Sequence, residues 1–290
     1  MTVTIGVHSS NPTLFHLSRL GYAEEELAAL GETVAWHPYT DGVRTGAHLA
    51  DGTIDFGGTG STPPVTAQAE GHDIVYTALS APRPGHGALL VTEDGPVRTV
   101  ADLRGGTVHL AVGSWQTHLV AKALDDAGLS YATDVTAVRS GDDSEELLRS
   151  GAITAWVAQG DRLAAARRTG GLRVLIPTDE VISDRSVFFT RRDLAERRPE
   201  LVEALTRALR RADAWVAAHP REAAEVTAAE LGGSAEDWET ALRALPWTIE
   251  EVSEEFLAEQ QRAADIFHRT GFTGRPVTVA DALPREARRA

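Results

Sequence analysis

The sequence predicts an α/β protein built from two lobes, with additional helices at the C-terminal end. Apolar runs typical of buried strands alternate with helical patterns as far as residue 177, and this alternation favours mostly parallel sheets covered by helices on both faces. The alternation stops and restarts between residues 82 and 96. A chain of 290 residues is long enough for two lobes with separate cores.

The first α/β unit begins with the apolar run TVTIGVH, which predicts a buried strand at 2–8 and is followed by a helical pattern. A short helix that ends at Gly52 follows the second strand, because glycine is the preferred residue just beyond a helix. A further helix follows the stretch GGTGSTPPV. The strands predicted in this part of the chain cover 2–8, 32–39, 54–58, 72–81 and 86–93.

The second unit repeats the pattern, with helices that end at Gly128 and at the glycine pair 170–171. Its predicted strands cover 107–112, 134–140, 153–159 and 172–177, and the segment that begins SVFFTRRDLAERRP leads into a purely helical tail reaching about residue 271. The chain thus crosses between the units twice, near 82–96 and near 183–190. We expect lobe I to comprise 1–86 plus 188–290 and lobe II to comprise 87–187, with a ligand cleft between them.

Composition excludes several classes of function. A net charge of −14 argues against a nucleic-acid partner, which needs clustered Lys and Arg, although one local pocket can still bind a small anion. No apolar run is long enough to insert into a membrane. Lys122 is the only lysine and there is no cysteine, so a P-loop lysine and thiol chemistry are excluded. The ten histidines lack metal-ligand spacing, so we expect no metal, no cofactor and no catalytic residue.

The N-terminal residues MTVTIGV form a predicted strand, without the basic and apolar regions of a signal peptide. The sequence therefore leaves the location open: cytoplasmic as written, or extracytoplasmic if this is a processed form.

Three strand-to-helix junctions share one pattern of residues. Serine, threonine and asparagine favour the N-cap position, and proline favours the first helical turn. The junctions place Ser10 or Asn11 before Pro12, Ser61 or Thr62 before Pro63, and Gly113 with Ser114 before the third helix.

A helix start carries unpaired N–H groups and a partial positive charge, and the carboxyl ends of strands line the ligand crevice of open α/β sheets. Three such starts would form an anion site without lysine. The alternative is that these residues only cap their helices. Nucleotide-binding loops do not fit, since the first glycine-rich stretch lacks G-K-[ST] and has Pro63 where a third glycine belongs.

Other residues are candidates for the cleft by their position near strand ends or helix starts. Trp115 and Trp156 could hold an organic tail or belong to the core, and Gln159 and Arg185 follow strands of the second unit. Arg185 is the one cation expected near the cleft, since guanidinium matches oxyanions, with a surface role as the alternative. His8 and His118 lie near helix starts and could reach the cleft, although a structural role is favoured for each.

The sequence resembles the substrate-binding proteins of nitrate/sulfonate/taurine ABC transporters, most closely the aliphatic-sulfonate-binding branch. The resemblance covers nearly the whole chain, and its most specific segment is IDFGGTGSTPPVTAQAEGHDIVY at 54–76. Further segments are VRTVADLRGGTVHLAVGS, LVAKALDDAGL, AWV, ADAWVAAHPREAA and EQQRAADIFHRTGF.

The resemblance implies the type II periplasmic-binding fold, two lobes that close on a small organic anion, and an ABC transporter permease as partner. Its ligand contacts correspond to the three helix starts and their successors: Ser10, Asn11, Gly60, Ser61, Thr62, Ser114, Trp115 and Gln116.

This sequence departs from the family where a wall of the pocket is expected. The family commonly has an acidic residue before the Ala-Trp pair and a Trp-Asp-Pro-like segment after it, whereas here Thr154 precedes and Gln159, Gly160 and Asp161 follow. The departure leaves two alternatives: a pocket that holds a different organic tail, or a pocket that does not favour sulfonate.

We interpret the sequence as a solute-binding protein that captures a small sulfonate-like anion of the alkanesulfonate or taurine type. The alternative is a cytoplasmic enzyme or ligand sensor of the same fold, acting on a small sulfur-containing or other organic anion. Related desulfinases and thiamine-pyrimidine synthases use cysteines that are absent here. An enzyme would have to rely on His8, Asn11, His118 or Arg185.

Overall fold

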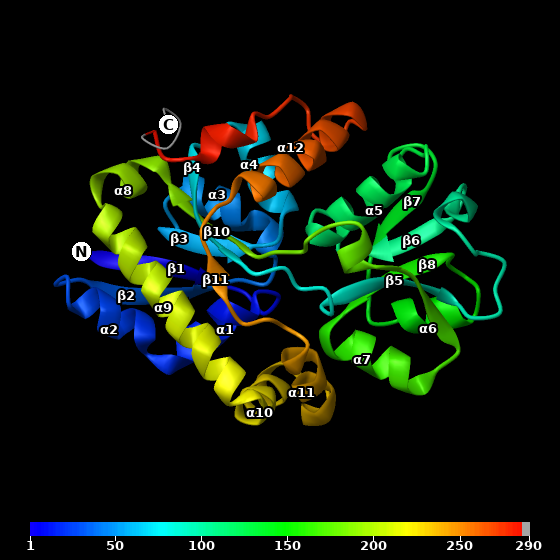
Figure 1. The fold of residues 1–290 in the computed structure, drawn as a ribbon, viewed down its shortest axis with the longest axis horizontal. Coiled ribbons are helices and arrows are strands. Elements are labelled where there is room, and N and C mark those ends of the chain that lie inside the picture. The colour runs from blue at the N-terminus through cyan, green and yellow to red at the C-terminus, as the bar shows by residue number, and fades with distance from the viewer. Residues whose placement is uncertain (286–290) are drawn as a thin grey trace.

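The computed structural model describes residues 1–285 and contains two α/β halves, each built around its own sheet (Figure 1). The C-terminal helices return to the half that contains the N-terminus (Figure 1). The lobe ranges 1–86 plus 188–290 and 87–187 remain our proposal for how the chain divides.

The first sheet has six strands in the order β11-β4-β10-β3-β1-β2. β1 runs parallel to β2 and β3, whereas β10 runs antiparallel to both of its neighbours and β11 antiparallel to β4. The strands are β1 (Thr2–Val7), β2 (Thr33–Pro38), β3 (Phe56–Thr59), β4 (Ile74–Ser80), β10 (Val187–Arg191) and β11 (Ile249–Glu250).

Strand β10 corrects two expectations, since the segment around SVFFT was predicted to lead into helices and the sheet to be mostly parallel. The strand lies between β3 and β4, and its side chains alternate between the two faces of the sheet. Phe188 packs in one core, while Val187 and Phe189 pack in the other. Strand β11 likewise interrupts the tail that was predicted to be purely helical.

The second sheet has five strands in the order β7-β6-β8-β5-β9. β6 runs parallel to β7 and β8, and β5 runs antiparallel to β8 and β9. The strands are β5 (Gly87–Thr92), β6 (Thr107–Leu110), β7 (Thr136–Arg139), β8 (Ala155–Gln159) and β9 (Leu172–Pro177). All nine strands predicted between residues 2 and 177 are therefore present, with bounds that differ by at most two residues at either end.

Helices cover both faces of each sheet (Figure 1). The long amphipathic helix α9 buries Leu201, Leu205 and Leu209 in a core shared with α1 and α2. The helices are α1 (Pro12–Leu20), α2 (Tyr22–Ala28), α3 (Thr45–Ala50), α4 (Thr62–Glu70), α5 (Trp115–Asp126), α6 (Ser144–Arg149), α7 (Gly160–Thr169), α8 (Arg192–Arg197), α9 (Pro199–Ala218), α10 (Pro220–Leu231), α11 (Ala235–Arg243) and α12 (Glu254–Arg269).

The two segments that cross between the halves are bonded to each other by buried polar groups. The Arg83 guanidinium donates to Ser186 Oγ over 2.7 Å, and His86 Nδ1 lies 2.7 Å from Asp184 Oδ2. Asp184 has φ +39°, in the left-handed region that non-glycine residues rarely adopt. These contacts hold the two crossing segments side by side.

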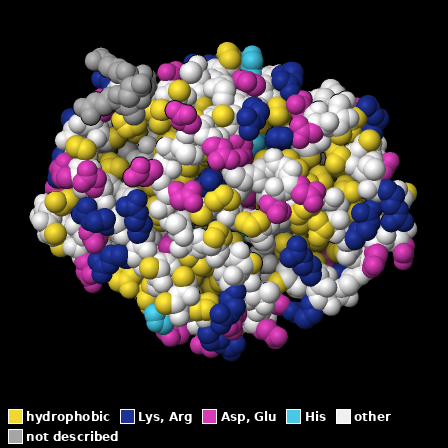
Figure 2. Space-filling model, viewed as in Figure 1, with side chains coloured by type: hydrophobic (Ala, Val, Ile, Leu, Met, Phe, Trp, Pro, Cys, Tyr) yellow, Lys and Arg dark blue, Asp and Glu magenta, His cyan; other side chains and the backbone are white. Residues whose placement is uncertain are grey.

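Helix α11 makes a further contact between the halves, because it packs on α7 of the second sheet. Arg168 of α7 and Asp237 of α11 form an ion pair. On the face of the molecule shown in Figure 2, acidic and basic side chains are interspersed over both halves. Within residues 1–285, no helix has the length and apolar character to cross a membrane.

Candidate functional site

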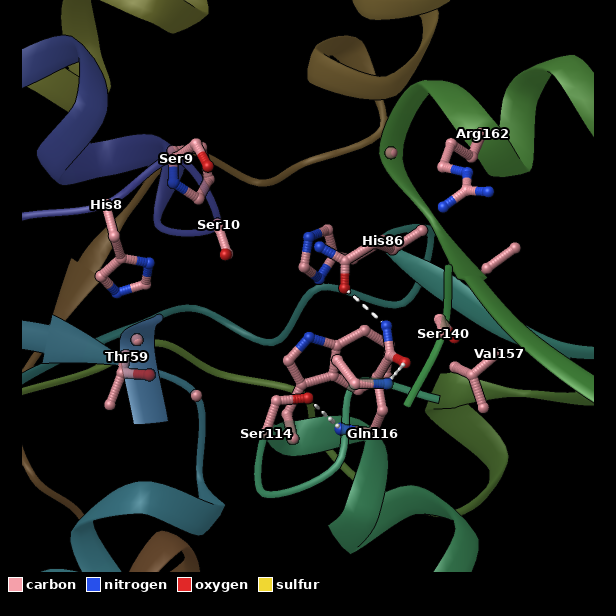
Figure 3. Close-up of a pocket in the computed structure, with 18 of the residues that line it drawn as sticks. His8, Ser9, Ser10, Thr59, His86, Ser114, Gln116, Ser140, Val157 and Arg162 are labelled. Carbon is pink, nitrogen blue, oxygen red and sulfur yellow. Dashed lines mark hydrogen bonds between the residues drawn. The ribbon is translucent and has the colours of Figure 1, made fainter. Parts of the chain in front are cut away.

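A cavity of about 730 Å³ lies between the two sheets (Figure 3). Its walls come from the carboxyl ends of β1, β3, β6, β7 and β8, from the starts of α1, α5 and α7, and from α11. It is lined by His8, Ser9, Ser10, Pro12, Thr40, Asp41, Gly42, Val43, Thr59, Gly60, Gly85, His86, Ala111, Val112, Ser114, Trp115, Gln116, Arg139, Ser140, Trp156, Val157, Ala158, Gln159, Gly160, Asp161, Arg162, Trp238, Ala241, Leu242 and Leu245.

His8 and Ser10 follow β1 and form the wall on the side of the first sheet (Figure 3). His8 is 4% exposed, and its Nε2 lies 2.9 Å from the carbonyl oxygen of Gly58, so Nε2 carries the proton. Burial lowers the pKa of His8, which favours the neutral ring. Its Nδ1 has no partner among residues 1–285. The Ser10 hydroxyl points into the cavity (Figure 3).

The wall on the side of the second sheet is formed by the first turn of α5. Ser114 caps this helix by accepting from the Gln116 backbone N–H over 3.1 Å. Gln116 Oε1 accepts from the Ala111 N–H, and its amide nitrogen donates to Gln159 Oε1 over 2.8 Å (Figure 3). The Gln116 side chain thus links Ala111, just after β6, to Gln159 at the end of β8, and Gln159 is held at the cavity wall.

Trp115 fits closely against two glycines. A Cβ atom at Gly60 would lie 2.8 Å from Trp115 Cβ, and one at Gly87 would lie 2.4 Å from Trp115 Cη2. Real Cβ atoms do not come this close, so glycine is required at both positions while the indole occupies this place. Trp115 of the second half is therefore wedged against the end of β3.

Arg139 and Arg162 are cations that line the cavity and that the sequence interpretation missed. The guanidinium of Arg162 lies 5.0 Å from the centre of the Trp156 ring and donates to the backbone oxygens of Gly141 and Asp142. Arg139 is exposed and lies 3.7 Å from Asp41 of the other half. Arg162 stands in the first turn after the predicted strand 153–159, which is the signal that could have identified it.

Two of the three predicted helix starts have the predicted cap. Asn11 accepts from the Leu14 N–H over 3.0 Å ahead of Pro12, and Ser114 caps α5. At α4, Ser61 has helical backbone angles and its hydroxyl makes no cap hydrogen bond. That hydroxyl lies 3.0 Å from His118 Nδ1 of the other half.

Four predicted site residues do not line the cavity. The Asn11 side chain caps α1 and donates to Ser186 Oγ, and Ser61 turns towards His118. Thr62 is the first residue of α4 and is fully buried. Arg185 donates to the Ser80 carbonyl oxygen and pairs with Glu250. The predicted residues that do line it are Ser10, Gly60, Ser114, Trp115, Gln116, Trp156 and Gln159.

His118 lies in the buried contact between the halves, where it packs edge-on against Phe267. It is 1% exposed, and burial lowers its pKa to about 3. It does not line the cavity, so the structural alternative holds for this histidine.

The chemistry of the cavity suits an oxyanion. Hydroxyl groups and the N–H groups of helix starts supply donors, and the dipoles of α1 and α5 place partial positive charge there. Within residues 1–285, no group of three or more His, Asp or Glu side chains is arranged to hold a metal ion.

Residues 22–223 match the protein family described as NMT1/THI5 like. A protein of Escherichia coli (strain K12), whose name describes it as an aliphatic sulfonates-binding protein, is 30% identical over 251 residues, covering 86% of this chain and 79% of that protein. The solved structure of the periplasmic aliphatic sulphonate binding protein SsuA from Escherichia coli has a TM-score of 0.86 at 27% identity, covering 97% of each chain.

The structure of the alkanesulfonate-binding protein SsuA from Xanthomonas axonopodis pv. citri, bound to MOPS, has a TM-score of 0.84 at 24% identity, again covering 97% of each chain. These likenesses span both halves of the molecule. The predicted periplasmic-binding fold is therefore confirmed.

Proposed function

Because the chain belongs to the NMT1/THI5-like family, we propose that it is a solute-binding protein that captures a small sulfonate-type organic anion between its two halves. We further propose that it delivers this ligand to an ABC importer. The similarity to sulfonate-binding proteins from Escherichia coli supports the ligand class.

One observation carries the proposal: the starts of α1 and α5, from opposite halves, meet at one cavity with serine hydroxyls in its wall. A sulfonate is ionised at neutral pH and presents three oxygens that only accept hydrogen bonds. Hydroxyls and helix-start N–H groups are donors that match this need. A ligand held by both halves also stabilises their closed arrangement.

Within this cavity we assign the oxyanion to Ser10, Gly60 and Ser114, and the organic part to the region flanked by Trp115, Trp156 and Gln159. All six line the cavity. The assignment replaces Asn11, Ser61 and Arg185, whose side chains bond to other groups, and Thr62, which is buried away from the cavity.

Ligand class is tested by thermal unfolding against methanesulfonate, longer alkanesulfonates, taurine, arylsulfonates, sulfinates, nitrate, sulfate and small carboxylates. A ligand at a hundred times its Kd stabilises the folded state by about 2.7 kcal/mol, which raises Tm by several degrees. We expect a sulfonate to produce this shift and to be recovered unchanged. A shift from carboxylates alone would contradict the proposal, and release of sulfite or sulfate would favour the enzyme.

The site assignment is tested by Ser10→Ala, which removes an exposed hydroxyl at the cavity wall. We expect at least a tenfold loss of sulfonate affinity by isothermal titration, since a hydrogen bond to a charged group contributes about 1.5–3 kcal/mol. The control is Ser18→Ala on α1, the helix that Ser10 precedes, where the hydroxyl donates to the Phe15 carbonyl oxygen and does not line the cavity. Equal affinities for the two variants would refute the assignment.

A further inference from the structure

His86 lines the cavity at the point where the first crossing segment enters β5 (Figure 3). The side chain is buried, and its Nδ1 lies 2.7 Å from Asp184 Oδ2 on the second crossing segment. Because a carboxylate oxygen only accepts, Nδ1 carries a proton. Nε2 has no hydrogen-bond partner among residues 1–285. It is therefore the ring nitrogen left free for a ligand in the cavity.

Trp115 brings His86 close to the residues assigned to the oxyanion. The centres of the Trp115 and His86 rings are 5.4 Å apart, and the rings are tilted by 38°. On its other side Trp115 packs against Gly60, where a Cβ atom would lie 2.8 Å from Trp115 Cβ. Ser114 precedes Trp115 in the chain. The imidazole and two of the three oxyanion residues are thus neighbours of one tryptophan.

Asp184 is a buried carboxylate with few other partners. It is 1% exposed, and its Oδ1 has no hydrogen-bond partner among residues 1–285. Arg83 acts on it through its charge, but the Arg83 guanidinium donates to Ser186 Oγ instead. A buried carboxylate favours positive charge on the ring that it bonds, since an uncompensated charge is costly away from water. Asp184 therefore both orients the His86 ring and favours its protonated form.

The protonation state of His86 decides what its free nitrogen offers to a ligand. In the neutral ring Nε2 is an acceptor, whereas in the imidazolium it is a charged donor. Sulfonate oxygens only accept hydrogen bonds, so they are repelled by the first form and bound by the second. Histidine is the side chain that changes charge between about pH 5 and pH 8. A bound sulfonate should therefore favour a proton on Nε2.

Other charged groups face His86 from the elements around it. On α5, Asp184 also acts on His118, but burial lowers the pKa of His118 to about 3 and keeps it neutral. Burial likewise lowers the pKa of His8, and it raises the pKa of Asp161, so Asp161 must be separated from His86 by experiment. The charged side chains that line the rest of the cavity are Asp41, Arg139, Asp161 and Arg162.

We propose that His86, positioned by Asp184, binds the anion as an imidazolium, and that capture of a sulfonate therefore takes up a proton and is tighter at lower pH. This inference rests on the proposed function and adds a pH dependence of the same site.

The test is isothermal titration of the full chain with ethanesulfonate and butanesulfonate, which stay ionised at every pH used. Bis-Tris, imidazole and Tris chlorides serve as buffers, because they differ in ionisation enthalpy and contain no sulfonate. We expect uptake of a fraction of a proton on binding at pH 7, and affinity that rises about fivefold or more from pH 8 to pH 6. His86→Gln is expected to abolish both effects. Asp184→Asn should reduce the uptake, because the amide can still accept from Nδ1 but carries no charge.

His109→Gln is the matched control. His109 is as buried as His86 and its Nδ1 is also bonded, to Ser144 Oγ, but it lies outside the cavity wall; the uptake should stay unchanged. A pH dependence that persists in His86→Gln and vanishes in Asp161→Asn would overturn the proposal. Sulfonate binding without proton uptake by the unmodified protein would overturn it too, and would leave the proposed function intact. If neither sulfonate binds at any pH, both proposals fail.

Discussion

Replacing Arg83 with alanine is expected to lower the free energy of unfolding by about 3–5 kcal/mol, because breaking a buried charge cluster leaves its other members uncompensated. Arg83 is 5% exposed, and it lies on the first crossing segment and bonds to the second. Its charge acts on Asp184 and Asp213, which are 1% and 2% exposed. Burial raises the pKa of Asp213 to about 7 despite this cation.

Urea unfolding at pH 7 measures this loss. Arg221→Ala is the control, since Arg221 is an exposed arginine paired with Glu225 and Glu239, and surface pairs contribute at most about 1 kcal/mol. Adding Asp213→Asn to Arg83→Ala should change the stability little further, because burial raises the pKa of Asp213 to about 7 even beside Arg83 and its carboxyl group is largely neutral once the cation is gone. A loss no larger than that of the control would show that the crossing segments do not depend on Arg83.

The second large effect concerns the loss of stability in acid, and His118→Gln is expected to make this loss smaller. Burial lowers the pKa of His118 to about 3, while an unfolded histidine titrates near 6.5. As pH falls below 6.5 the unfolded state therefore gains a proton that the folded state does not bind. The stability contributed by the neutral ring is fully present above pH 6.5 and is lost progressively down to about pH 3.

At pH 4.5 this loss amounts to about 2.7 kcal/mol, from two pH units at about 1.36 kcal/mol each. The fall in unfolding free energy between pH 7.5 and pH 4.5 should be smaller by this amount in His118→Gln, whose amide can still reach Ser61. All other titrating groups are common to both proteins and cancel. His219→Gln, at an exposed histidine, should leave the fall unchanged; an equal change in both variants would contradict the argument.

The strands up to residue 177 could be predicted because each is an apolar run bounded by helix signals. β10 could not, although FFT is strongly apolar, since its neighbours β3 and β4 lie more than a hundred residues away along the chain. The local sequence at 187–191 favours a strand only weakly, because the residues that follow have a helical pattern. Its antiparallel direction depends entirely on where the chain re-enters the first sheet.

Prediction of the site residues was limited in the same way, by contacts between segments that are far apart in the sequence. Ser114 both caps α5 and lines the cavity, whereas at α1 the cap is Asn11 and the residue before it, Ser10, lines the cavity. Ser61 was misplaced because its helical backbone angles remove it from capping, and its partner His118 belongs to the other half. Arg185 was predicted to be the cation of the cleft, but it forms an ion pair with Glu250 of β11. Contacts between segments that are distant in the sequence determine where these side chains lie. The same is true of α11, whose place in the cavity wall could not be predicted from the local sequence.

The insertion of β10 between β3 and β4 has a consequence for the nascent chain. When the ribosome has completed β4, the edges of β3 and β4 are still unpaired, and they stay so until about 110 further residues have been added. The strands of the second sheet are contiguous in sequence and can pair within that interval. We therefore expect the second half to fold first during synthesis, while the open edges of the first are the part of the chain most in need of a chaperone.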